Sequence, residues 1–114
     1  MVDYILKDRS LGIKSPRDIV CLVRNPAKAK DLIKAGVSII RGDLGDHQKI
    51  HQALQDPEIL YVFHNAANID VTSDYKSFYR ANVIGTQHVL DAFVKSSGKT
   101  LIFASSIAVY DTFL

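Results

Sequence analysis

Runs of apolar residues alternate with helical patterns along this chain, and that alternation is its main organising feature. The run at 18–23 is continuously apolar after its first residue and rich in β-branched residues, as expected for a strand buried on both faces. Shorter apolar runs at 37–40, 59–64 and 100–104 predict three more strands, of which the last contains a buried Leu-Ile-Phe stretch.

Helix signals occupy each gap between these strands. Asn25-Pro26 supplies an N-cap followed by proline at the first helical position, and Gly36 closes that helix. Asp46 can cap a second helix, which Asp56-Pro57 stops. The third helix is the longest, because apolar residues recur at helical spacing over 73–97.

Strand and helix alternate with short connections, which predicts parallel β-α-β units in a layered α/β fold. The order is β-α-β-α-β-α-β within a single domain spanning 1–114. Residues 1–17 have modest helical character and then a polar turn, so they are interpreted as the tail of a helix entering the first strand. A domain that opens in this way lacks its first strand, whereas a genuine N-terminal cap helix is the alternative.

Composition narrows the class of protein. Hydrophobic residues make up 47% and charged residues 23%, which is typical of a soluble globular protein. The net charge of +2 is too weak to indicate nucleic-acid binding, and no apolar run approaches a membrane span. Cys21 is the only cysteine, so a cytoplasmic, reducing compartment is expected. His47 and His51 are four residues apart, and a surface helix is favoured there over a metal site.

Two motifs at predicted strand ends suit a nucleotide, because ligands bind at the carboxyl edge of open α/β sheets. Arg24, followed by Asn25, stands where an acidic residue would favour NAD(H); a basic residue accommodates a 2′-phosphate and favours NADP(H). A solvated arginine is the equal alternative. In Gly42-Asp43-Leu44, the carboxylate can accept a hydrogen bond from an exocyclic amino group while the leucine packs on a base. For this tripeptide alone an ordinary Gly-Asp turn is favoured.

Two more motifs follow the later strands. His64-Asn65-Ala66-Ala67 carries small side chains that let backbone approach a ligand closely, although an ordinary strand exit explains it too. Ser105-Ser106 places hydroxyls where one could donate to a substrate carbonyl oxygen. No G-x-S-x-G surrounds them, which argues against a nucleophile elbow.

The order of these motifs resembles the short-chain dehydrogenase/reductase superfamily, in its extended branch of NAD-dependent epimerases, dehydratases and reductases. The resemblance covers roughly 18–110, and its most specific part lies in one long helix that contains Asn82, Gly85 and Thr86. It implies a Rossmann-like, doubly wound parallel sheet, here partial. The matching stretches are GDL (42–44), VFHNAA (62–67), YRANVIGTQHVLDA (79–92) and LIFASSIAVY (101–110).

The resemblance also implies a role for each motif. Asp43 and Leu44 would hold adenine, Asn82 would support the cofactor site, and Ser106 would hydrogen-bond the substrate oxygen during hydride transfer. NADP(H) is the expected cofactor, with NAD(H) as the alternative. The implied cofactor-binding residues are Arg24, Asn25, Asp43, Leu44, Ala66, Ala67 and Asn82, and no metal ligand is implied.

Two family motifs do not occur in these 114 residues. There is no G-x-x-G-x-x-G turn to receive the pyrophosphate, and no Y-x-x-x-K follows Ser106. Tyr110 is only four residues beyond Ser106, and Leu114 occupies the matching lysine position, so Tyr110 is interpreted as a bystander. Tight cofactor binding is therefore doubtful.

The expected function is that of a fragment of an NAD(P)-dependent oxidoreductase, epimerase or dehydratase acting on a small hydroxyl or carbonyl substrate. As an isolated chain it should be inactive and marginally stable, because the strands at 18–23 and 59–64 would each lose a neighbour. A fatty-acyl (acyl-thioester) reductase fragment and a non-catalytic regulatory protein of the same fold stay open. Long helices such as 73–97 often form the family's dimer interface, so a homodimer is also considered.

Overall fold

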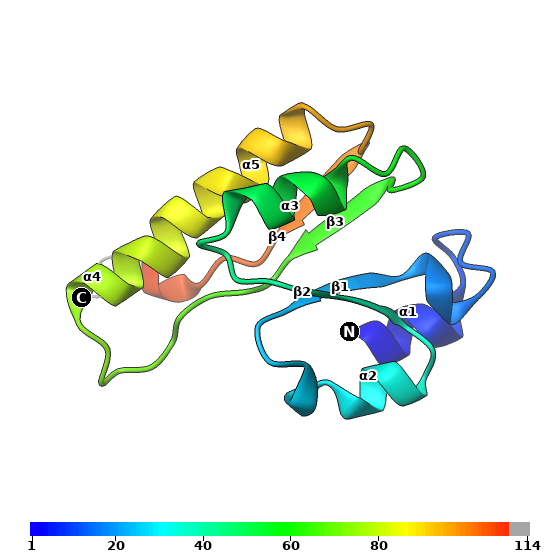
Figure 1. Cartoon of the computed structure of the whole chain (residues 1–114), viewed down its shortest axis with the longest axis horizontal. Coiled ribbons are helices and arrows are strands. Elements are labelled where there is room, and N and C mark those ends of the chain that lie inside the picture. The colour runs from blue at the N-terminus through cyan, green and yellow to red at the C-terminus, as the bar shows by residue number, and fades with distance from the viewer. Residues whose placement is uncertain (110–114) are drawn as a thin grey trace. The chain divides into compact units, whose positions relative to one another are not determined.

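The computed structural model of the chain describes residues 1–109 (Figure 1). Tyr110 and Leu114, the positions compared with the Y-x-x-x-K motif, lie outside the described residues. The chain divides into two compact units, Met1–Asp43 and Leu44–Leu114, and each is described by itself.

The first unit is built around two parallel strands. Strands β1 (Val20–Val23) and β2 (Ser38–Arg41) pair with Val20 opposite Ser38, and α2 (Lys30–Lys34) connects them, which confirms the predicted β-α-β unit. Helix α1 (Val2–Asp8) precedes the strands and agrees with the helical pattern near the N-terminus. Two short 3₁₀ helices, Pro16–Asp18 and Pro26–Lys28, flank β1.

Local signals define the borders of these elements. The Asn25 side chain accepts a hydrogen bond from the Ala27 N–H at 3.0 Å, which confirms the predicted N-cap. Gly36 follows α2 with φ of +83°, the left-handed conformation that favours glycine at a helix end. The first strand begins at Val20 and not at Asp18, because the Asp18 carboxylate instead accepts the N–H groups of Ser15 at 2.9 Å and Lys14 at 2.7 Å.

The second unit pairs another two parallel strands, β3 (Tyr61–His64) and β4 (Thr100–Phe103), with Tyr61 opposite Thr100. Helix α3 (His47–Leu54) precedes β3 and lies alongside α5 (Gly85–Val94), which connects the two strands (Figure 1). The Asp46 side chain accepts the Lys49 N–H at 3.1 Å, so the predicted cap of α3 is confirmed. A 3₁₀ turn, Ile107–Val109, follows β4.

The long helix predicted over 73–97 is divided into three parts. Helix α4 (Tyr75–Phe78) begins after the Asp74 cap, continues as a π-helical segment (Tyr79–Ile84), and only then becomes α5. Its apolar pattern is also less completely buried than expected, since Val89 lies in the core whereas other apolar side chains are exposed. The exposed ones are Tyr75, Tyr79, Val83, Leu90 and Val94.

Buried apolar side chains are concentrated in the second unit. Ile50 and Leu54 of α3 are buried with Val89 and Ala92 of α5, as the spacing of Ile50 and Leu54 predicts. In the first unit the buried apolar residues are small ones, Ala29 and Val37.

The mixed architecture with parallel pairs agrees with a partial Rossmann-like fold. Among residues 1–109, β1 is hydrogen-bonded to β2 alone and β3 to β4 alone, so each strand has one neighbour. The prediction that the strand at 18–23 is buried on both faces was wrong, since Val20 is 40% exposed. The stretch Leu101–Phe103 is likewise less buried than predicted, since Ile102 is 38% and Phe103 52% exposed. A two-stranded sheet lacks the flanking strands and covering helices that would remove these side chains from water.

Candidate nucleotide-binding site

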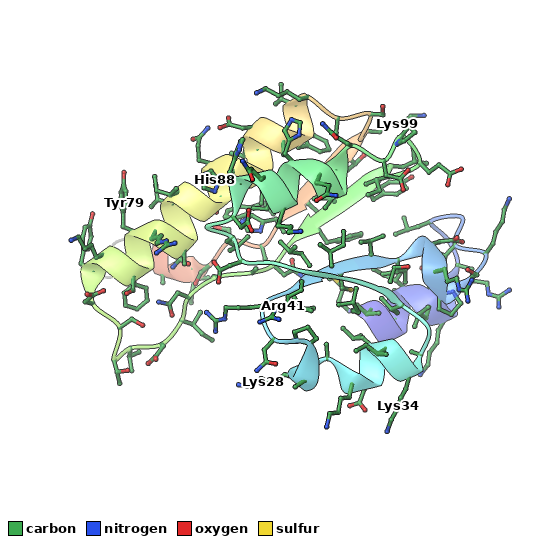
Figure 2. All side chains as sticks on the ribbon, viewed as in Figure 1. Lys28, Lys34, Arg41, Tyr79, His88 and Lys99 are labelled. Carbon is green, nitrogen blue, oxygen red and sulfur yellow. The ribbon has the colours of Figure 1, made fainter. Side chains whose placement is uncertain are left out.

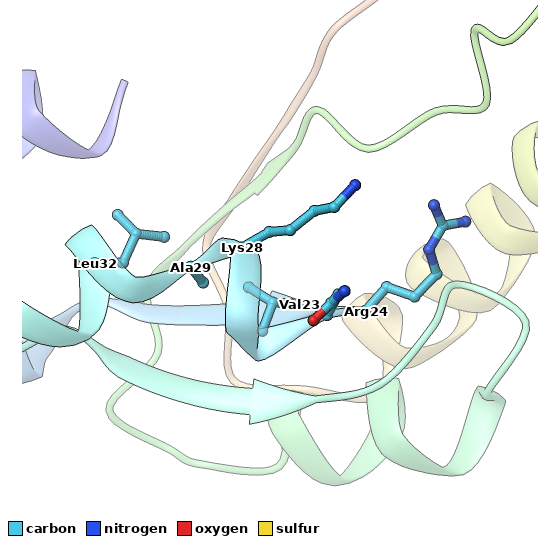
Figure 3. A pocket seen from close by; sticks show the side chains of 6 residues that line it. Val23, Arg24, Lys28, Ala29 and Leu32 are labelled. Atoms are coloured by element: carbon cyan, nitrogen blue, oxygen red, sulfur yellow. The ribbon is translucent and has the colours of Figure 1, made fainter.

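A cavity of about 380 Å³ opens beside the carboxyl end of β1 in the first unit (Figure 3). Apolar side chains of Val23, Ala29 and Leu32 contribute to its lining. The polar lining comes from Arg24, Asn25 and Lys28, which extend from the strand end and from the 3₁₀ turn that follows it. Two cations beside an apolar surface suit a ligand that combines a phosphate with a flat, uncharged group.

The cavity lining includes Arg24 and Asn25, which the sequence indicated as candidate cofactor-binding residues. It also includes Lys28, which sequence reasoning missed. Asn25 caps the turn Pro26–Lys28, and this tight turn places Lys28 on the same cavity as Arg24. The sequence did contain a signal for Lys28. An Asn-Pro cap directly after a strand predicts a helical turn, and such a turn brings Lys28 back toward Arg24.

Leu44 begins the second unit and packs closely on α5. A Cβ atom added to Gly85 would lie 2.7 Å from the Leu44 Cβ, a distance that real Cβ contacts do not show. This close approach explains why glycine stands at the start of α5, where it would otherwise cost about 1 kcal/mol relative to alanine. Asp43, the preceding residue, is exposed at the end of the first unit.

The backbone of Leu44 is held as well. The Leu44 carbonyl accepts a hydrogen bond from His88 Nδ1 at 2.9 Å, although the two residues are 44 positions apart. Figure 2 shows His88 on α5, on the side of the helix near α3. The His88 ring also meets the ring of His47 edge-on at 5.1 Å between centroids.

Asn82 fixes the loop that follows Ala66 and Ala67. Its side-chain oxygen accepts the Asn68 N–H at 2.6 Å, and its amide donates to the Asn68 carbonyl at 2.9 Å. Both alanines are exposed, so their backbone is accessible. The geometry fits the supporting role that the resemblance implies for Asn82.

His64 joins the end of β3 to α5. Its Nε2 lies 2.9 Å from the Thr86 hydroxyl oxygen, and the residue is only 5% exposed. Burial lowers the pKa of His64, because desolvation disfavours the imidazolium form. The ring serves as a structural hydrogen-bonding group between β3 and α5.

Ser106 is exposed and follows β4. Its Oγ accepts the Ala108 N–H at 3.1 Å, which anchors the turn Ile107–Val109. A hydroxyl that accepts one hydrogen bond still carries its own proton, so Ser106 retains a donor for a substrate oxygen.

Clusters of three metal ligands and membrane-spanning helices are both absent from residues 1–109. No three histidine, cysteine or acidic side chains come together there in a way that could hold a metal ion. No helix in the same part of the chain is both long and apolar enough to cross a membrane.

Comparison with known proteins decides the family. The family model for the 3-beta hydroxysteroid dehydrogenase/isomerase family matches residues 13–112. The chain belongs to this family. It is thereby placed in the extended short-chain dehydrogenase/reductase group, as the motif resemblance predicted, and members of this group use a nicotinamide cofactor.

Curated relatives from bacteria and animals support this assignment. The chain is 35% identical to a 2-alkyl-3-oxoalkanoate reductase of Stenotrophomonas maltophilia (strain K279a), over 77% of this chain and 26% of the relative. It is 33% identical to mouse 3 beta-hydroxysteroid dehydrogenase type 7, over 68% of this chain and 22% of that protein.

An epimerase matches too, namely N-acetyl-alpha-D-glucosaminyl-diphospho-ditrans,octacis-undecaprenol 4-epimerase of Escherichia coli O157:H7, 41% identical over 60% of this chain and 20% of the relative. The matched regions therefore span about a quarter or less of these relatives.

Proposed function

We propose that this chain carries the adenosine-binding part of an NADP(H)-dependent enzyme that acts on a small hydroxyl or carbonyl substrate. The cavity at the end of β1 carries the proposal, because it combines Arg24 and Lys28 with an apolar surface. A guanidinium and an ammonium group supply charge-assisted hydrogen bonds to a 2′-phosphate, which NAD(H) lacks.

The residues present fit this part of the cofactor. Arg24 and Lys28 would hold the 2′-phosphate, while Val23, Ala29 and Leu32 offer apolar contact beside it. Asp43, the last residue of the first unit, would accept a hydrogen bond from the adenine amino group. When bound, the nicotinamide group would supply or accept hydride.

Ser106 is proposed to act on the substrate side. Its hydroxyl would donate a hydrogen bond to the substrate oxygen, and this bond would stabilise the negative charge that develops there. No Y-x-x-x-K follows Ser106 in the 114 residues, so general acid–base assistance worth about 10²–10⁴-fold is not supplied by that pair. The chain alone is therefore proposed to bind adenine nucleotides weakly and to lack turnover.

Calorimetric titration with NADP⁺ and NAD⁺ tests the cofactor proposal. The unmodified chain should prefer NADP⁺, and Arg24→Asp should reverse that preference by weakening NADP⁺ about tenfold or more. Lys28→Ala should weaken NADP⁺ by a smaller factor, about three- to tenfold, because an exposed ammonium group is partly screened.

Lys34→Ala is the matched control for Lys28→Ala. Lys34 belongs to α2 and is exposed like Lys28, but it does not line the cavity (Figure 2). It should leave both affinities unchanged. Equal losses for Lys28→Ala and Lys34→Ala would show that net charge, rather than a built site, attracts the ligand.

A homodimer is proposed as the assembly. Tyr75, Tyr79, Val83, Leu90 and Val94 recur at helical spacing and are between 41% and 81% exposed. A second copy presenting the same apolar stripe would cover it on both partners. Sedimentation should show a dimer that Tyr79→Lys dissociates, while a monomer at all concentrations would contradict the proposal.

A further inference from the structure

Three histidine rings lie close together where α3 runs beside α5, and all three belong to the second unit. The centroids of the His47 and His88 rings are 5.1 Å apart and the rings meet edge to face. The His51 ring lies 6.1 Å from that of His47. His47 is exposed and the other two are half-buried, so water and dissolved ions reach this group.

The hydrogen bond of His88 defines which of its ring nitrogens is available. Its Nδ1 lies 2.9 Å from the Leu44 carbonyl oxygen. A carbonyl oxygen only accepts, so Nδ1 carries the proton and the neutral ring keeps its lone pair on Nε2. Histidines that bind metal ions usually donate their second ring N–H to a carbonyl or a carboxylate, which fixes the orientation of the ring. His88 is therefore held in the form that a metal ligand takes.

His51 is held in the opposite form. Its Nδ1 lies 3.0 Å from the side-chain nitrogen of Gln55, and an amide nitrogen only donates. Nδ1 of His51 therefore accepts, and in the neutral ring the proton is on Nε2, which leaves no lone pair for an ion. The sequence draws attention to His47 and His51, four residues apart on one helix, but the pair that the structure brings into position is His47 with His88.

The spacing of this pair suits a single metal ion. Zn–N bonds of about 2.0–2.1 Å in a tetrahedral site place the centroids of two imidazole ligands about 5 Å apart. The two helices pack through residues that include the buried Ile50 and Val89, so the rings are held before an ion arrives. The positive end of the α3 dipole disfavours a cation at His47, and the carboxylate of Asp46 at the same helix end offsets this effect.

We propose that His47 and His88 bind Zn²⁺ and that the bound ion links α3 to α5. Imidazole nitrogens are ligands that suit Zn²⁺, and water completes the coordination where the protein supplies only two ligands. The site requires the two helices to lie side by side, so it exists only in the folded chain. Zn²⁺ therefore stabilises the second unit by binding the folded state in preference to the unfolded one.

Calorimetric titration of the tag-free, 114-residue chain with ZnCl₂ tests this proposal. Changes to the partners of metal ligands already cost about 10–100-fold in metal affinity, so His47→Gln and His88→Gln should each weaken Zn²⁺ by about tenfold or more. His51→Gln is the matched control. It removes a neighbouring ring of the same cluster and should leave the affinity within about twofold of the unmodified chain.

The pattern of losses identifies the ligands. A loss in His47→Gln and His51→Gln, but not in His88→Gln, would assign the ion to α3 alone and overturn the link between the helices. Equal affinity of the unmodified chain and a double His47→Gln, His88→Gln variant would overturn the site altogether. His47 is exposed, so His47→Gln decides the matter even if His88→Gln does not fold.

Two further readouts do not depend on the measured affinity. In ¹⁵N spectra of the histidine rings, Zn²⁺ should shift Nε2 of His88 and leave both nitrogens of His51 in place. The urea midpoint of the unmodified chain should rise with Zn²⁺, return with EDTA, and stay constant in His47→Gln. A midpoint that does not respond to Zn²⁺, or a shift at His51 in place of His88, would overturn the proposal.

Discussion

The two units are stabilised in different ways. In the first, Met1–Asp43, side-chain hydrogen bonds are mainly local, such as Asn25 to Ala27 and Asp18 to Ser15. In the second, side chains of His64, Asn82 and His88 bond to partners 22, 14 and 44 residues away. The charged cavity lies in the locally determined unit, while the long-range bonds fix the loops of the other. Affinity for phosphate and positioning of loops should therefore respond to different mutations.

The largest expected effect is a loss of stability when a buried core residue of the second unit is shortened. Ile50 of α3 is 3% exposed, and Ile50→Ala should lower the free energy of unfolding by about 2–5 kcal/mol, because it leaves a cavity between α3 and α5. Ile33→Ala is the matched control in the first unit, where Ile33 is 49% exposed, and should cost less than about 0.5 kcal/mol. Urea denaturation measures the free energy of unfolding of both variants. Equal decreases would show that the two units do not differ in how well their apolar side chains are packed.

A smaller effect is expected where α5 meets Leu44. Gly85→Ala should destabilise the second unit by about 1–3 kcal/mol, because the new Cβ would lie 2.7 Å from the Leu44 Cβ. Gly45→Ala is its control, since the nearest atoms belong to the flexible end of Arg80, at 3.2 Å and beyond. That variant should change stability by about 0.5 kcal/mol or less. A harmless Gly85→Ala would show that Leu44 does not approach α5 so closely.

The pH dependence of stability should be milder and should arise in the second unit. Burial places the pKa of His64 below its ordinary value of 6.5, so protons bind the unfolded chain more strongly. The contribution of His64 to the free energy of unfolding should be constant above pH 6.5. It should be lost as the pH drops through the lowered pKa of His64. His64→Gln should flatten this part of the curve. An unchanged slope would assign the pH dependence to other groups.

Much of the first unit could be predicted from sequence, because its signals are local. Asn25-Pro26 and Gly36 identify the turn and helix end that the structure contains. Asp18 was assigned to a strand because the apolar run beside it dominated, although Ser15 and Asp18 have the spacing of a capping box.

Less of the second unit could be predicted. Gly85 and His88 gave no local sign of their contact with Leu44, and nothing in the periodicity of 73–97 indicates a π-helical segment. Such features depend on tertiary packing, and residues 44 positions apart meet only once the fold exists. Lys28 is intermediate in predictability. Its place on the cavity depends on a local turn that Asn25 caps and that brings Lys28 back toward Arg24.

One measurement tests the central claim most directly, namely titration of the ¹⁵N-labelled chain with 2′-AMP and, separately, 5′-AMP. The adenosine-site proposal predicts tighter binding of 2′-AMP, with the largest amide shifts at Arg24, Asn25 and Lys28. Equal affinity for both nucleotides, or shifts confined to residues away from the cavity, would contradict it.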